Sequence, residues 1–150
     1  MSDIRTLPNE RLFADLECLF DEGGDVQLPV KGYSMRPFLK SERDSVHLLP
    51  ATSVRLRRGM VVLFRYRTGH ILHRIRRIEG DRLTIVGDGN CRQQERVMRT
   101  DVLAWADAIR RNGHTIRYGS CRWRLLSAYS LALHLARTLY YTLRGSRRRA

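Results

Sequence analysis

The sequence has little lysine, few cysteines and no long apolar run. Three cysteines, Cys18, Cys91 and Cys121, are widely spaced and odd in number, which excludes a disulfide framework or a Cys-based zinc site and predicts free thiols in a reducing compartment. No stretch of eighteen apolar residues is present, so no ordinary transmembrane helix is predicted. The first thirty residues are acidic and lack the apolar segment of a signal peptide. We therefore expect a cytoplasmic protein or one peripheral to a membrane.

The charge is strongly positive and unevenly distributed. The net charge over 150 residues is +13, and the basic residues are almost all arginine. Acidic residues dominate positions 1–30, whereas positions 31–100 and 101–150 are basic. A basic body predicts an anionic partner: a phospholipid surface, a nucleic acid or an acidic region of another protein. The length fits one domain with a core of its own, so folding requires no metal or disulfide. We also expect no metal site and no cofactor.

The spacing of apolar residues predicts a mainly β protein with a helix at each end. Helical spacing over 9–22 predicts an amphipathic helix, which a pair of glycines ends. Apolar runs broken by Gly, Asn and Asp predict an antiparallel sheet. Its strands are expected at 26–30, 45–49, 60–67, 70–79, 82–87, 102–110 and 115–118, the last two joined by a turn at Asn112 and Gly113. We divide the chain into an N-terminal helix (1–25), a β domain (26–119) and a basic C-terminal helix and tail (120–150).

The C-terminal helix, predicted over 122–143, has an apolar centre between basic ends. Residues 125–136 contain one imidazole and no full charge, and arginines lie on both sides. A tryptophan and several tyrosines supply amphipathic rings. This composition is typical of a helix that lies in the surface of an anionic membrane. Packing on the protein's own sheet and a contact within a dimer are the alternatives, and the oligomeric state stays open.

Three short motifs contain residues suited to nucleophilic catalysis. In "KGYSMRPF", Gly32 lets the chain turn and Pro37 fixes the backbone downstream, so Ser34 is either a turn serine or a nucleophile on a stiffened loop. In "HILHRIRRI", His73 lies between two isoleucines on one strand face, as a core histidine or a neutral general base would. In "VGDGN", Asp88 is either a turn residue or a group that orients an imidazole.

As a set, these motifs resemble the signal peptidase I and LexA-type clan of serine peptidases. The matching residues are Gly32-x-Ser34-Met35-x-Pro37, His73-Arg74-Ile75 and Gly87-Asp88-x-Asn90. The resemblance covers about residues 26–110. It is closest to the branch, typified by archaeal and endoplasmic-reticulum signal peptidases, that uses histidine where bacterial members use lysine. Many members have a serine hydroxyl two residues before the nucleophile, where this chain has Gly32.

The resemblance implies a LexA- or signal-peptidase-like antiparallel β fold and a serine endopeptidase. Its expected substrate is a peptide or precursor protein with small side chains at the cleavage site, bound as an extended strand. Ser34 would be the nucleophile, His73 the general base and Asp88 a supporting residue. The Ser34 amide would be one oxyanion donor, in a substrate loop shaped by Gly32, Met35 and Pro37.

Two other classes of function fit parts of the pattern. A LexA-like DNA-associated regulator would explain the positive charge, but the acidic first 25 residues have room for one helix, so nucleic-acid binding is not expected. A binding module could keep the fold without catalysis, because a fold does not determine activity.

Overall fold

An acidic helix, eight strands and a long basic helix follow one another along the chain. The structure, a computed structural model, describes residues 9–147; residues 1–8 and 148–150, which belong to the predicted N-terminal region and basic tail, lie outside it. Helix α1 (Asn9–Asp21) comes first and α2 (Cys121–Arg147) last. The strands are β1 (Val26–Pro29), β2 (Asp44–Pro50), β3 (Val61–Tyr66), β4 (Gly69–Glu79), β5 (Arg82–Val86), β6 (Glu95–Met98), β7 (Val102–Arg111) and β8 (His114–Arg117), with 3-10 turns η1 (Ala51–Ser53) and η2 (Arg99–Asp101).

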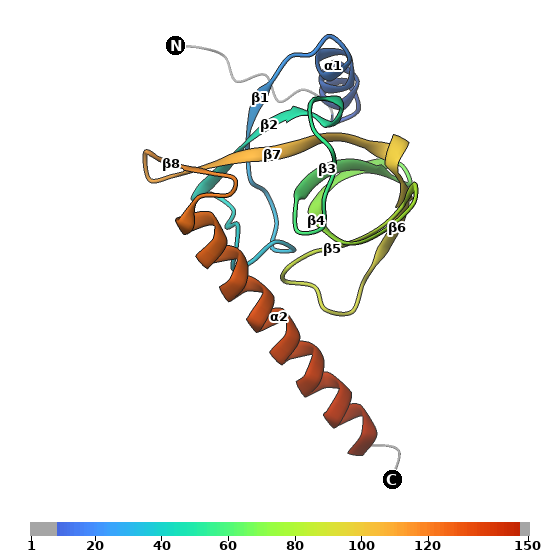
Figure 1. The fold of residues 1–150 in the computed structure, drawn as a ribbon, viewed down its shortest axis with the longest axis vertical. Helices are drawn as coiled ribbons and strands as arrows, with labels where there is room; N and C mark the ends of the chain where they lie inside the picture. The colour runs from blue at the N-terminus through green and yellow to red at the C-terminus, as the bar shows by residue number, and fades with distance from the viewer. Residues whose placement is uncertain (1–8, 148–150) are drawn as a thin grey trace.

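The strands form one antiparallel sheet in the order β1-β2-β7-β3-β4-β5-β6, with β8 paired to β7. The mainly β architecture with a helix at each end is confirmed, and each strand predicted from the sequence is present. The turn residues Asn112 and Gly113 both have positive φ, as a tight hairpin requires. Strand β6 was not predicted. The β3–β6 part of the sheet curls round on itself (Figure 1).

Two hydrophobic clusters hold the fold together. The first lies beneath α1 and the start of α2, and it combines Leu16 and Phe20 of α1 with Phe38 and with Trp123 of α2. The second fills the curled part of the sheet around Phe64 and residues of β4 and β5. Both terminal helices therefore contribute to the same core as the β1-β2-β7 strands, which fixes them to the sheet.

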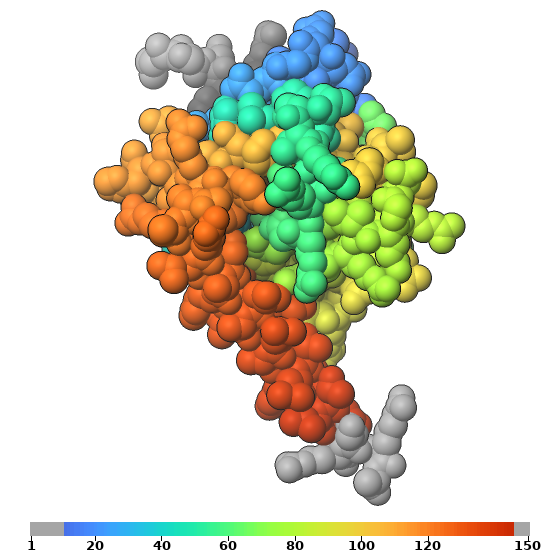
Figure 2. Space-filling view, viewed as in Figure 1, coloured from blue at the N-terminus to red at the C-terminus, as the bar shows by residue number. Residues whose placement is uncertain are grey.

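Helix α2 starts beside β8 and extends past the body of the protein. It runs obliquely along one flank, and its C-terminal part projects beyond the sheet (Figures 1 and 2). The helix is longer at both ends than the predicted 122–143. Within residues 9–147, no helix is long and apolar enough to cross a bilayer.

Candidate active site

Ser34 lies exposed in the turn between β1 and β2, on a loop anchored from below. Met35 and Phe38 are buried in the first cluster and tie the loop to the core. Gly32 has a φ of 84°, a left-handed conformation in which a serine would be strained, which accounts for a glycine at this position. Within the described residues, neither the Ser34 amide nor its hydroxyl donates to an acceptor. The loop thus presents a hydroxyl and a free N–H side by side.

His73 of β4 meets the Ser34 loop at Gly87. A Cβ placed on Gly87 would lie 2.6 Å from the main-chain oxygen of Ser34 and 2.9 Å from Nε2 of His73. The amide of Gly89, two residues on, donates to the same Ser34 oxygen at 2.8 Å. The three motifs predicted from the sequence therefore come together, and glycine at 87 is required for the backbone of Ser34 and the imidazole to approach.

The other side of the His73 ring contacts a carboxylate that sequence analysis did not single out. Nδ1 lies 3.1 Å from Oε2 of Glu95, at the start of β6. Both side chains are buried. When the Glu95 carboxylate is ionised it accepts hydrogen bonds only, so Nδ1 then carries the proton and Nε2 presents its lone pair toward Gly87 and the Ser34 loop. This tautomer is the one that a general base requires.

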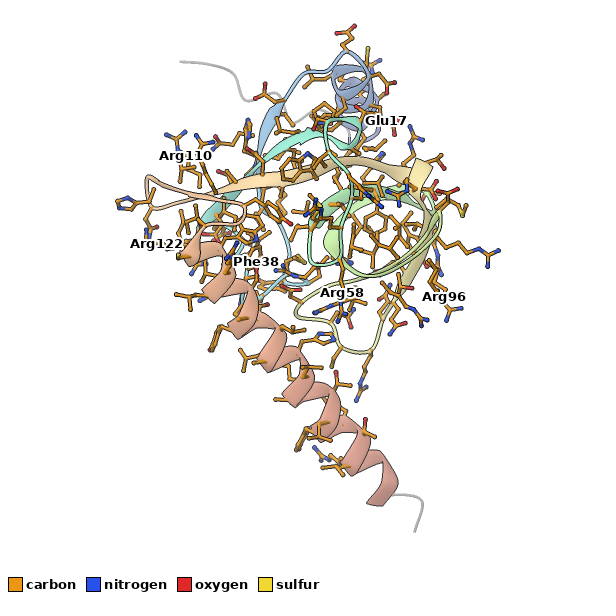
Figure 3. All side chains as sticks on the ribbon, viewed as in Figure 1. Glu17, Phe38, Arg58, Arg96, Arg110 and Arg122 are labelled. Carbon is orange, nitrogen blue, oxygen red and sulfur yellow. The ribbon has the colours of Figure 1, made fainter. Side chains whose placement is uncertain are left out.

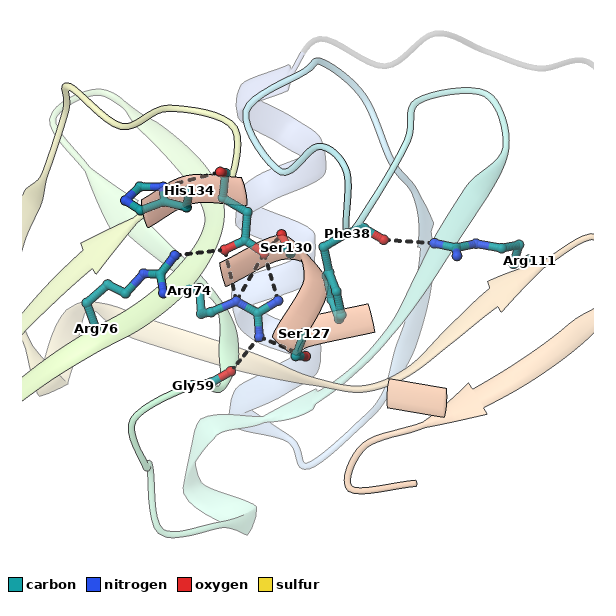
Figure 4. A network of polar contacts seen from close by, with 9 residues as sticks. Phe38, Gly59, Arg74, Arg76, Arg111, Ser127, Ser130 and His134 are labelled. Atoms are coloured by element: carbon teal, nitrogen blue, oxygen red, sulfur yellow. Dashed lines mark hydrogen bonds and ion pairs between the residues drawn. The ribbon is translucent and has the colours of Figure 1, made fainter. Parts of the chain in front are cut away.

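Asp88 serves a different group from the one expected. Its carboxylate accepts from Nε and Nη2 of Arg74 at 2.9 and 2.8 Å and from the hydroxyl of Ser130 at 2.7 Å (Figure 4). Arg74 also donates to the Gly59 carbonyl and to Ser127. The network is buried, and it links the loop after β5 to β4 and to α2.

The alternation of β4 explains the difference. His73 and Arg74 are adjacent on the strand, so their side chains point to opposite faces. Asp88 binds Arg74 and so belongs to the face away from the imidazole, and among the described residues no hydrogen bond joins it to His73. The geometry gives Asp88 a role in holding the Gly87–Gly89 loop in place. Glu95, not Asp88, contacts the imidazole of His73.

A groove of about 340 Å³ adjoins Ser34 and is mainly apolar. The end of β1 and the first part of β4 both line it. Strand β1 is at the edge of the sheet, and residues 69–72 of β4 pair with β3 alone, because β5 pairs from Arg74 onward. Both walls therefore present strand edges with unused main-chain groups. A larger hollow, of about 700 Å³ over β5 and β6, shares no lining residue with this groove.

Helix α1 closes one end of the groove. Leu12 and Phe13 line it, and Phe13 stacks on His70 at 4.1 Å between ring centroids. Glu17 fixes the helix by bonding both Arg65 and His70. The hydrogen bond from Arg65 is the main cause that lowers the pKa of Glu17 to about 2, with His70 acting in the same direction against burial. The helix is thus bound to the sheet by a charged carboxylate at neutral pH.

No protein-family model, curated protein or solved structure matches this chain. Within the described part of the chain, no three His, Cys, Asp or Glu side chains are grouped as metal ligands would be.

Proposed function

We propose that this protein is a serine endopeptidase with a LexA- or signal-peptidase-like fold, and that Ser34 is its nucleophile and His73 its general base. One observation carries the proposal: Nε2 of His73 and the main chain of Ser34 meet at Gly87 while Nδ1 is held by Glu95. The groove beside Ser34 supports a peptide as the substrate.

The proposed reaction proceeds through an acyl-enzyme. Nε2 of His73 takes the proton of the Ser34 hydroxyl as Oγ bonds to the substrate carbonyl carbon, and the Ser34 amide donates to the developing oxyanion. The imidazolium then gives that proton to the amine that leaves as the peptide C–N bond breaks. In the second half, His73 takes a proton from water, the hydroxide oxygen bonds to the acyl carbon, and the proton returns to Ser34 as the acid product leaves.

An extended peptide is the proposed substrate. Two strands with unpaired edges, β1 and the start of β4, both line the apolar groove. A peptide laid between them gains main-chain hydrogen bonds on both sides, and alternate side chains enter the groove. The scissile carbonyl then lies next to Ser34, at the mouth of the groove.

The test is labelling by a fluorophosphonate probe, which reacts only with an activated serine. Wild type should be labelled, and Ser34→Ala should lose all labelling while its unfolding free energy stays within about 0.5 kcal/mol of wild type, as is usual for an exposed loop side chain. Ser41→Ala is the matched control, because Ser41 lies in the following turn of the same loop. That variant should be labelled like wild type.

Labelling retained in Ser34→Ala would remove Ser34 from the mechanism. Absence of labelling in folded wild type, together with binding of extended peptides, would favour a non-catalytic binding module on the same fold.

A further inference from the structure

Helix α2 has two rows of side chains with different surroundings. One row, at spacings of three and four residues, faces the body: Trp123 and Ser130 are buried, and His134 reaches the Asp88 carbonyl. Near the far end, Arg92 of the loop after β5 stacks on Tyr141 at 4.3 Å, so this row contacts the body along most of the helix. The second row is offset by two residues, about half a turn, and points away.

The outward row is apolar and exposed. It comprises Leu125, Tyr129, Ala132, Ala136, Leu139 and Leu143, again at spacings of four and three residues. Leu125 is 72 % exposed, and Leu139 and Leu143 are 60 % and 59 % exposed. A continuous apolar stripe of this kind is typical of a surface that binds something else. We call these six residues the outward stripe.

The charges beside the outward stripe are all of one sign. Residues 121–147 contain five arginines and no acidic residue. Arg122 and Arg124 lie at its start, and Arg144, which contacts the Tyr140 ring and hydroxyl, lies at its end. A second copy of the helix would place arginines beside arginines, at an electrostatic cost. An anionic surface gains from the same charges.

An arginine groove of about 460 Å³ lies between α2 and the body, and two residues of its lining, Arg124 and Ala128, directly precede Leu125 and Tyr129 of the stripe along the helix. Arg57, Arg58, Arg76 and Arg124 line it, together with Ser127 and Leu131. Within the described residues, the side chains of Arg57, Arg58 and Arg124 make no ion pair. Burial lowers the pKa of Arg76, and the charges of Arg74 and Arg58 act in the same direction against Asp88. Cations therefore crowd this groove without enough acidic partners. Figure 3 shows Arg58 projecting beside the helix.

We propose that the outward stripe and the arginine groove together form a binding face for an anionic phospholipid surface. The stripe is buried among acyl chains at the boundary, and the groove takes the phosphate ester of a headgroup. A lipid surface fits both features at once, because its acyl chains are apolar and its headgroup layer is negatively charged. It also adapts to the protein surface, so no precise shape complementarity is needed. This inference does not rest on the peptidase activity.

The test is co-sedimentation of the full chain with phosphatidylserine–phosphatidylcholine vesicles at low salt. Wild type should bind these vesicles, bind pure phosphatidylcholine much less, and release at high salt. Arg57→Ser with Arg58→Ser should lower the partition coefficient by about 25-fold, at about fivefold for each arginine. The charge-matched control is Arg96→Ser with Arg110→Ser, two exposed arginines on β6 and β7, and it should lower binding by less than about twofold.

The apolar half has its own pair of variants. Leu139→Ser with Leu143→Ser should weaken binding about tenfold or more, whereas Met98→Ser, an exposed apolar residue on β6, should not. Ser34→Ala should bind vesicles like wild type. Vesicle binding would therefore still be expected if the protein proved not to be a peptidase.

Five outcomes would overturn the inference. The first is that wild type does not bind anionic vesicles at low salt, and the second is that both arginine double variants lose binding equally. The third is that the groove binds inorganic phosphate while the protein does not bind vesicles. The fourth is that the protein has no affinity for lipid but forms a dimer, which Leu139→Ser with Leu143→Ser dissociates. The third and fourth would assign the face to a free phosphate or to a second copy. The fifth, retention by an acidic polypeptide without vesicle binding, would assign it to a protein partner.

Discussion

Glu95 is fully buried, and one of its carboxylate oxygens, Oε1, has no hydrogen-bond partner among the described residues. A buried carboxylate that is only half satisfied costs free energy in the resting protein. That cost would be offset when the neighbouring imidazole becomes positively charged, as the proposed acylation requires. Asp88 differs in this respect, because its two oxygens are saturated by Arg74 and Ser130.

The two carboxylates should therefore affect different quantities. Glu95→Gln should lower the rate of peptide cleavage by about 10²–10⁴-fold, because the imidazolium loses its counter-charge, with little effect on the unfolding midpoint. Asp88→Asn should destabilise the fold by about 3–5 kcal/mol, since it leaves the buried Arg74 without its partner. The measurements are the rate of peptide cleavage and thermal unfolding, for both variants and for His73→Ala.

His73→Ala sets the reference for this comparison. His73→Ala should lower the rate of peptide cleavage by several orders of magnitude, as removal of a general base does. The double variant His73→Ala with Glu95→Gln should cleave peptide no more slowly than His73→Ala alone, because the Glu95 carboxylate acts through the imidazole. A wild-type rate in Glu95→Gln would show that the contact in the structure does not serve catalysis.

Among individual site residues, the sequence predicts only those that belong to recognisable motifs. Ser34 and His73 were identified because Ser-Met-x-Pro and His-Arg are recognisable as short strings. Glu95 was not, because "QQER" has no motif and its contact with His73 spans 22 positions between two strands. Glu95 rather than Asp88 contacts His73 because side chains alternate along β4. This alternation places His73 on the opposite face from Arg74, and Asp88 binds Arg74.

Among the elements, the loop after β5 connects most of the site. It touches the Ser34 loop through Gly89, the imidazole through Gly87, and α2 through Asp88. The long strands and both helices could be predicted because each has a clear apolar period. Strand β6 could not, because it has four residues and only one strongly apolar buried position, Val97, beside Glu95.

Gly87→Ala tests this loop directly. Its Cβ would clash with main-chain Ser34 and with the His73 ring, so we expect cleavage and probe labelling to fall by at least about 10²-fold, as when catalytic groups are displaced by about 1 Å. Gly69→Ala, on β4, is the matched control, since a Cβ there meets nothing within 4 Å. Normal labelling of Gly87→Ala would mean that Ser34 and His73 do not approach each other at this point.

On the scale of the whole molecule, strand order was beyond prediction from sequence. The local apolar pattern identifies β2, β3 and β7 as strands. In the sheet, β7 lies between β2 and β3 and pairs with both, although more than 35 positions of chain separate it from either. That arrangement is set by burial of the two clusters rather than by any one segment. It also brings Arg111 at the end of β7 to Asp44 at the start of β2.

Asp44 should make the stability of the whole fold sensitive to acid. It is buried, and although burial alone would raise its pKa, hydrogen bonds from Arg43, Arg111 and the Lys40 amide lower it to about 2. A carboxyl with a depressed pKa in the folded state stabilises the protein above its unfolded pKa, near ~4, and loses that contribution as pH falls toward ~2. Glu17 has the same sign.

We therefore expect the free energy of unfolding to be nearly flat from about pH 7 to 5 and to fall steeply from about pH 4 to 2, with about 2 kcal/mol of the loss due to Asp44. His47, whose pKa is raised by Asp107 and Asp25 against the opposing effect of burial, contributes with the opposite sign. Its contribution to stability is complete below about pH 6.5 and fades as pH rises through the pKa of the folded state.

Urea unfolding at each pH measures the free energy of unfolding as a function of pH. Asp44→Asn should lose stability at pH 7 and show a shallower acid decline, whereas the exposed Asp81→Asn should follow wild type. An acid decline of wild-type steepness in Asp44→Asn would mean that the charge of Asp44 does not hold β2 to β7.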